Sequence, residues 1–144
     1  MLDRKIKTLL IEDSGFMCML IGRLLQADKS IQLVATARNG LEGVNKARRL
    51  RPDVIITNMV MPHYDGLFVV KTLMKEWPVP IILLSSLDGK DPQIFDALKA
   101  GAFSFLEKPR ALDISKGHPL LARLVHEASV VGREKLRRKN KKKE

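Results

Sequence analysis

The stretch Arg-Pro-Asp-Val-Ile-Ile-Thr-Asn-Met-Val-Met-Pro-His-Tyr-Asp-Gly, residues 51–66, shows how this chain is built. Its apolar, mostly β-branched run over Val54–Thr57 is typical of a strand buried on both faces of a sheet. The polar residue Asn58 follows the run directly, and Asp65-Gly66 predicts the turn into a helix. The stretch therefore predicts a buried strand, a loop that begins with a polar side chain, and a helix start.

The same alternation continues in both directions along the chain. Short apolar runs predict strands at Ile6–Ile11, Ile31–Ala37, Val54–Thr57, Pro80–Leu84 and Phe103–Leu106. Between and after them, apolar residues recur every three or four positions and predict helices over residues 16–27, 41–50, 67–77, 94–102 and 120–131. Five strand–helix units in this order predict an α/β protein with a doubly wound parallel sheet, covered by helices on both faces.

Length and composition indicate one globular domain. The chain has 144 residues, of which 45% are hydrophobic and 29% are charged, so it can bury a core. Its one cysteine, Cys18, excludes a disulfide framework and favours a reducing compartment. The apolar run Ile6–Ile11 is too short for a signal peptide, and no stretch reaches the length of a membrane span. We therefore expect a soluble, cytoplasmic protein.

The positive charge is concentrated at the C-terminus. The formal net charge is +10, and residues 133–144 hold eight Lys or Arg residues against two Glu residues. We predict a domain over residues 1–132 and a basic tail or interdomain linker over 133–144. Such a tail could bind polyanions through counterion release. It has no aromatic residue on which bases could stack, so nucleic acid is not the partner that we expect.

Polar side chains follow four of the predicted strands, at the edge of the sheet where ligands bind in such folds. These are Glu12, Asp13 and Ser14 after the first strand, Asn58 after the third, Ser85 and Ser86 after the fourth, and Glu107 and Lys108 after the fifth. Two carboxylates and a carboxamide suit Mg²⁺, and a hydroxyl with an ammonium group would bind phosphoryl oxygens. Loops often begin with polar residues, but complementary chemistry at four strand ends favours a metal-assisted phosphoryl site.

The sequence resembles the receiver domain of two-component response regulators, from Lys7 to about His126. The matching stretches are Leu-Leu-Ile-Glu-Asp-Ser (9–14), the stretch 51–66, Pro-Ile-Ile-Leu-Leu-Ser-Ser (80–86), Ala-Gly-Ala (100–102) and Lys-Pro (108–109). The stretches 34–37, 85–90 and 100–109 resemble the N-terminal receiver of the chemotaxis protein-glutamate methylesterase. The resemblance implies a three-layer, flavodoxin-like fold with strand order 2-1-3-4-5.

The resemblance also implies roles for individual residues. Glu12 and Asp13 would be the acidic pair that holds Mg²⁺, with the backbone carbonyl of Val60 and the side chain at position 58 as further ligands. Among the residues that contact or sense the phosphoryl group, Ser85 would be the switch hydroxyl, Phe105 the aromatic switch, and Lys108 the phosphoryl-binding lysine. A cis peptide bond between Lys108 and Pro109 is expected on the same basis.

One position departs from the family pattern. Where the family has its phospho-accepting aspartate, this chain has Asn58. A carboxylate can attack phosphorus and form an acyl phosphate, whereas the nitrogen lone pair of a carboxamide is delocalised and its oxygen is a weak nucleophile. We expect that the chain does not accept a phosphoryl group there and that it binds Mg²⁺ more weakly. Asn58 is either an introduced substitution or part of a natural receiver that signals without phosphorylation.

The partners implied by the resemblance are a chemotaxis-type histidine kinase and an output domain, such as a methylesterase domain. The chain has no Gly-x-Ser-x-Gly motif, so we expect it to be a regulatory domain and not an enzyme. Two other interpretations remain open. One is a pseudo-receiver that works through protein contacts without phosphorylation, and the other is a nucleic-acid adaptor that uses the basic tail.

Overall fold

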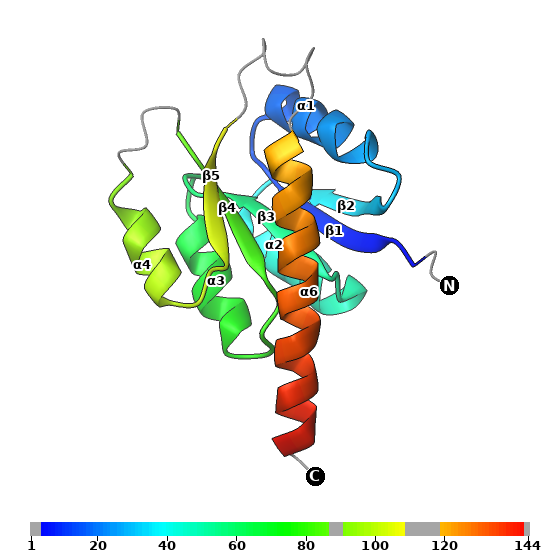
Figure 1. Cartoon of the computed structure of the whole chain (residues 1–144). Helices are drawn as coiled ribbons and strands as arrows, with labels where there is room; N and C mark the ends of the chain where they lie inside the picture. Colours follow the sequence, from blue (N-terminus) through cyan, green and yellow to red (C-terminus); the bar gives the residue numbers. More distant parts are fainter. Residues whose placement is uncertain (1–3, 87–90, 109–118, 143–144) are drawn as a thin grey trace.

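The computed structural model describes residues 4–86, 91–108 and 119–142, and the strands within these ranges form one parallel sheet (Figure 1). The strands are β1 (Ile6–Ile11), β2 (Ile31–Ala37), β3 (Val54–Asn58), β4 (Ile81–Ser85) and β5 (Ser104–Glu107). Their order in the sheet is β2-β1-β3-β4-β5 and every neighbouring pair is parallel. The predicted fold class and strand order are thus confirmed.

Helices cover both faces of the sheet. They are α1 (Gly15–Gln26), α2 (Gly40–Leu50), α3 (Gly66–Met74), α4 (Gln93–Lys99) and α6 (Pro119–Lys142). Helices α2, α3 and α4 pack on one face, and α1 and α6 pack on the other (Figure 1). No helix in the described part of the chain combines the length and the apolar character that a membrane span requires.

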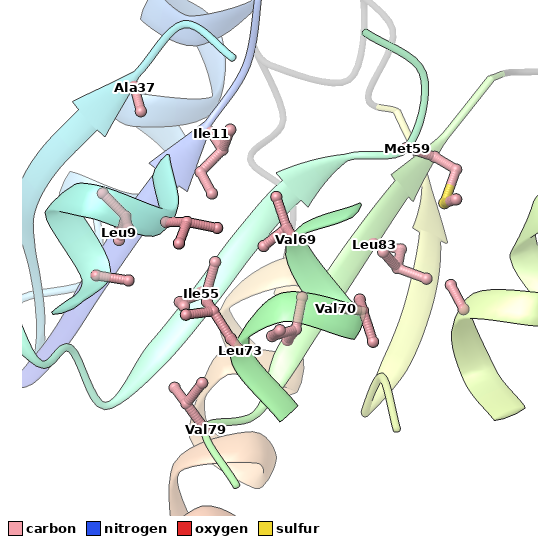
Figure 2. Close-up of a cluster of buried hydrophobic side chains, with 14 of the residues drawn as sticks. Leu9, Ile11, Ala37, Ile55, Met59, Val69, Val70, Leu73, Val79 and Leu83 are labelled. Atoms are coloured by element: carbon pink, nitrogen blue, oxygen red, sulfur yellow. The ribbon is translucent and has the colours of Figure 1, made fainter. Parts of the chain in front are cut away.

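Each face of the sheet has its own hydrophobic core. Successive residues of a strand point to opposite faces, so Ile55 belongs to the core under α2, α3 and α4, and its neighbour Ile56 belongs to the core under α1 and α6. Figure 2 shows the first core, in which Val69, Val70 and Leu73 of α3 lie over strands β1, β3 and β4. The central strands are therefore buried on both sides, as their continuous apolar runs predicted.

Three helices begin with a side-chain cap at the edge of the sheet that carries the candidate site. Ser14 Oγ accepts a hydrogen bond from the Met17 backbone N–H at 3.2 Å. Asn39 caps α2 in the same way, and Asp65 Oδ1 accepts a hydrogen bond from the Phe68 backbone N–H at 2.9 Å and caps α3. These caps fix where each helix leaves the loop after its strand. The turn predicted from Asp65 is confirmed.

Some predicted boundaries differ from the structure. Strand β4 begins at Ile81 and not at Pro80, because proline has no N–H to donate to the sheet. Helix α4 ends at Lys99, and the chain then turns through Gly101, which has a φ of 121°. Helix α6 continues to Lys142 and does not stop near residue 131. The division of the chain at residue 132 stays a prediction, and no break in secondary structure coincides with it.

Candidate functional site

The structure brings the predicted site residues together at the carboxyl edge of the sheet. Glu12 and Asp13 follow β1, Asn58 is the last residue of β3, Ser85 is the last residue of β4, and Lys108 follows β5. Parallel strands end at the same edge, which is why residues far apart in sequence meet there. Glu12, Asn58 and Ser85 are almost completely buried.

The amide nitrogen of Asn58 lies at the point where three oxygen atoms converge. It donates to Asp13 Oδ1 at 2.9 Å, to the Val60 backbone carbonyl at 2.9 Å, and to Glu12 Oε2 at 3.2 Å. An amide NH₂ has two hydrogens, so one of the three contacts shares a hydrogen with another. The side chain of Asn58 thus presents donors, and no nucleophilic atom, to the acidic pair.

Glu12 is the most buried charged side chain of the site, and both of its oxygens face a partner. Oε2 accepts a hydrogen bond from the Ser14 backbone N–H at 3.0 Å, and Oε1 lies 3.3 Å from the Nζ of Lys108. Burial raises the pKa of Glu12, and its hydrogen bond with Asp13 adds to this, whereas Ser14 and Lys108 oppose it. Lys108 is therefore the cation that compensates the buried carboxylate.

Asp13 behaves in the opposite way. Burial alone would raise its pKa, but the hydrogen bonds from Glu12 and from Asn58 outweigh burial and lower the pKa. The two carboxylates thus differ, and a proton that enters the pair resides on Glu12. Asp13 keeps the negative charge, and it is the more exposed of the two.

Arg38 joins the site although no role there was predicted for it. Its guanidinium Nη2 donates to the Asp13 backbone carbonyl at 3.0 Å and its Nε donates to the same oxygen at 3.3 Å. Arg38 follows β2 at the same edge of the sheet as the other site residues. That position is the sequence signal from which its contact could have been anticipated.

The oxygen atoms around the Asn58 amide are of the kind that binds a hard divalent cation. Two carboxylates and one backbone carbonyl face a common point, and the amide nitrogen of Asn58 occupies that point and donates hydrogen bonds to all three. Within the described residues, no three His, Cys, Asp or Glu side chains gather where they could hold a metal ion. The oxygen donors therefore fit Mg²⁺ in chemistry, but the Asn58 amide competes for them.

The two predicted switch residues lie on neighbouring strands, Ser85 at the end of β4 and Phe105 on β5, where it pairs with Leu83. Ser85 is 1% exposed, and its backbone carbonyl accepts a hydrogen bond from the Lys108 N–H at 3.0 Å. Phe105, on β5, is 46% exposed. The expected cis bond before Pro109 lies outside the described residues. The roles of Ser85, Phe105 and Lys108 stay predictions.

The chain is similar to known proteins over most of its length. The family model described as "Response regulator receiver domain" matches residues 8–115. A protein-glutamate methylesterase/protein-glutamine glutaminase of Methanococcoides burtonii is 42% identical over 113 residues, which are 77% of this chain and 32% of that protein. The protein-glutamate methylesterase/protein-glutamine glutaminase 2 of Pseudomonas fluorescens is 40% identical over 129 residues, which are 86% of this chain and 34% of that protein. The chain thus spans about a third of the length of the curated relatives it matches.

Solved structures show the same likeness. The response regulator domain of Thermotoga maritima CheB is 33% identical with a TM-score of 0.79, and the match covers 88% of this chain and 97% of that domain. A chain from the CheX-CheY-BeF3-Mg²⁺ complex of Borrelia burgdorferi is 25% identical with a TM-score of 0.71, and the match covers 85% of this chain and 89% of that one.

Proposed function

Because this chain belongs to the family of response regulator receiver domains, and resembles the CheB receiver, we propose that it regulates an output without itself accepting a phosphoryl group. The observation that carries the proposal is the Asn58 amide. It stands where the family resemblance puts the phospho-accepting carboxylate, and its nitrogen donates into the acidic pair.

The chemistry of the amide supports an unphosphorylated receiver. Transfer of a phosphoryl group from a phospho-histidine needs an attacking oxygen that carries an available electron pair. In Asn58 the nitrogen lone pair is delocalised into the carbonyl and both of its hydrogens are directed at oxygens of Glu12, Asp13 and Val60. Lys108 and Ser85 would still be able to hold phosphoryl oxygens, but no acceptor stands between them.

Mg²⁺ would bind to the oxygens that now face the amide. The related CheX-CheY structure is described as a complex with BeF3 and Mg²⁺. In this chain Asp13, Glu12 and the Val60 carbonyl would hold the ion, and it would neutralise negative charge on phosphoryl oxygens. Binding requires the Asn58 amide to turn away from these oxygens, so we propose weaker Mg²⁺ binding than in a receiver with aspartate at this position.

The partners follow from the relatives. Their names describe methylesterases, and the match covers about a third of each relative, so we propose that this domain regulates a methylesterase output domain and is itself not an enzyme. A chemotaxis-type histidine kinase is the proposed upstream partner. With Asn58, the switch formed by Ser85, Phe105 and Lys108 rests in the population that the unphosphorylated state favours.

The test is intact mass after incubation with acetyl phosphate and Mg²⁺, for the chain as written and for Asn58→Asp. We expect the mass of one phosphoryl group to be added to the Asn58→Asp variant alone, since the substitution supplies the missing nucleophile. The double variant Asn58→Asp with Lys108→Met serves as control, because it keeps the nucleophile and removes the phosphoryl-binding ammonium. Phosphorylation of the chain as written would contradict the proposal.

A second candidate function is a pseudo-receiver that binds protein partners independently of phosphorylation. Compensation of the acidic pair within the chain favours it, because the Asn58 amide donates to both carboxylates and the Lys108 ammonium lies 3.3 Å from Glu12 Oε1, although that oxygen accepts no hydrogen bond. If Asn58→Asp also fails to gain a phosphoryl group, restoring the carboxylate is not enough to make the pocket accept phosphate, and this candidate becomes the better account.

A further inference from the structure

A cavity lies at the edge of the sheet opposite the candidate site, where β3 and β4 begin. Its volume is about 260 Å³. Helix α6 runs past this edge, and its red C-terminal end projects beyond the body of the domain in Figure 1. The residues that line the cavity and matter here are Arg4, Arg51, Trp77, Val79, Pro80 and Arg133.

The floor of the cavity is apolar. Trp77 is 9% exposed and Val79 is 3% exposed, so both present only a small surface to the cavity. Helix α6 approaches this floor closely at Gly132, where an added Cβ atom would lie 2.7 Å from Cδ of Pro80. The close approach sets the next residue, Arg133, at the rim of the cavity.

The rim is cationic and comes from three separate segments. Arg51 follows α2 with a left-handed backbone φ of 48°, and its guanidinium stands 4.2 Å from the centroid of the Trp77 ring. Arg4 contributes from the N-terminal segment and Arg133 from α6. Among the described residues of the lining, the acidic one is Asp53. It is occupied already, because it accepts a hydrogen bond from the Lys7 backbone N–H at 2.8 Å and pairs with Arg4 at 3.6 Å.

Helix α6 extends this positive rim outward. Residues spaced by four are neighbours on a helix, and a stripe that winds slowly around α6 leads from Ser129 in the cavity through Arg133 and Arg137 to Lys141. All three of these basic residues are exposed. Glu134 precedes Arg137 by three positions and is the acidic neighbour of this stripe, and its Oε1 lies 4.0 Å from Nε of Arg138. The stripe therefore carries three basic residues beside this acidic neighbour, so its charge is positive.

We propose that this cavity and the basic stripe of α6 bind an acidic segment of a partner protein. An apolar side chain of that segment would enter the cavity, and flanking Asp or Glu residues would pair with Arg51, Arg133 and Arg137. Charge complementarity argues for an acidic ligand. The apolar floor argues for a protein segment over nucleic acid, because Arg51 covers the Trp77 ring and leaves it unavailable for stacking on bases.

The experiment uses the fluorescence of Trp77, which is the single tryptophan of the chain and lies in the cavity. The probe is a synthetic acidic peptide without Trp or Tyr, made of Asp and Glu residues around two adjacent leucines. A second peptide replaces both leucines by serine. We expect the leucine peptide to change the fluorescence saturably and to bind about tenfold more tightly than the serine peptide. This is the difference in affinity that burial of one apolar side chain in the cavity would produce.

Matched variants localise the binding. Arg133→Glu should weaken the leucine peptide about tenfold or more, because it reverses the charge at the rim. Arg123→Glu makes the same charge change on the same helix, away from the cavity, and should leave the affinity within about twofold. Arg51→Asn should also weaken binding, and asparagine tolerates the left-handed backbone there, so the fold is preserved.

Three outcomes would overturn the proposal. One is equal binding of the serine peptide, and another is equal binding of an oligothymidylate that carries the same charge, since either shows a general polyanion surface. The third is an equal loss in Arg133→Glu and Arg123→Glu. Thermal melts of each variant, followed by circular dichroism, show that the proteins compared are folded.

Discussion

Replacing Asn58 by aspartate should destabilise the protein when no metal ion is present. The amide nitrogen stands 2.9 Å from Asp13 Oδ1 and 3.2 Å from Glu12 Oε2, so a carboxylate oxygen at the same place would face two like charges. Each such pair repels by about 5 kcal/mol at an effective dielectric constant of 20. Lys108 and rotation of the new carboxylate relieve most of this repulsion, and the net cost we expect is ~1–2 kcal/mol, or roughly 2–8 °C in Tm.

Mg²⁺ should reverse this order. An ion that binds the folded state stabilises it in proportion to its affinity, so the Asn58→Asp variant should gain more from Mg²⁺ than the chain as written. The assay is a set of thermal melts in EDTA and across a Mg²⁺ titration. Asn45→Asp is the matched control, because it makes the same chemical change at an exposed position of α2. A higher Tm of the Asn58→Asp variant in EDTA would refute the reasoning.

Three further predictions concern the framework of the domain. Gly43→Ala should cost ~1–3 kcal/mol in urea unfolding, because its Cβ would overlap Cδ1 of Ile11 and lie 2.7 Å from Cγ1 of that buried side chain; an unchanged midpoint would show that Ile11 can move aside. Leu73→Ala should cost roughly 2–5 kcal/mol in the same assay, since Leu73 is fully buried in the core of Figure 2, and a smaller loss would mean that the core collapses around the cavity. Hydrogen bonds from Ser30 are the main cause that lowers the pKa of Asp28 below its ordinary value, so the stability that Asp28 contributes is present above that value and is lost as pH falls through the folded-state pKa. Asp28→Asn should therefore lose up to about 1 kcal/mol at neutral pH and less near pH 3, whereas a difference independent of pH would point to packing.

Most of the fold could be predicted because its strands are buried on both faces. Runs such as Val54–Thr57 are continuously apolar, a pattern that distinguishes them from the helices, in which apolar residues recur every three or four positions. The capping residues Ser14 and Asp65 stand where helices begin. The end of α6 was missed, because Lys, Arg and Glu favour helix without producing an apolar period. A charged helix that extends beyond the domain body therefore has the composition of a linker.

The location of the site followed from the polar residues that end the strands, since topology alone brings such residues to one edge. What could not be predicted is the direction in which a side chain points. The donation of the Asn58 amide to three oxygens depends on a rotamer that is set by packing. The cavity around Trp77 was missed as well, because its lining comes from four separate stretches of the chain.

The unbroken course of α6 through residue 132 fixes a rotational phase. Each residue of an α-helix advances the chain by 1.5 Å and turns it by about 100°. A helical segment that continues in register beyond Lys142 would therefore hold its side chains at a set angle to the sheet. Inserting or deleting a single residue after Gly132 would swing that angle by more than a quarter turn, whereas a change of seven residues would nearly restore it.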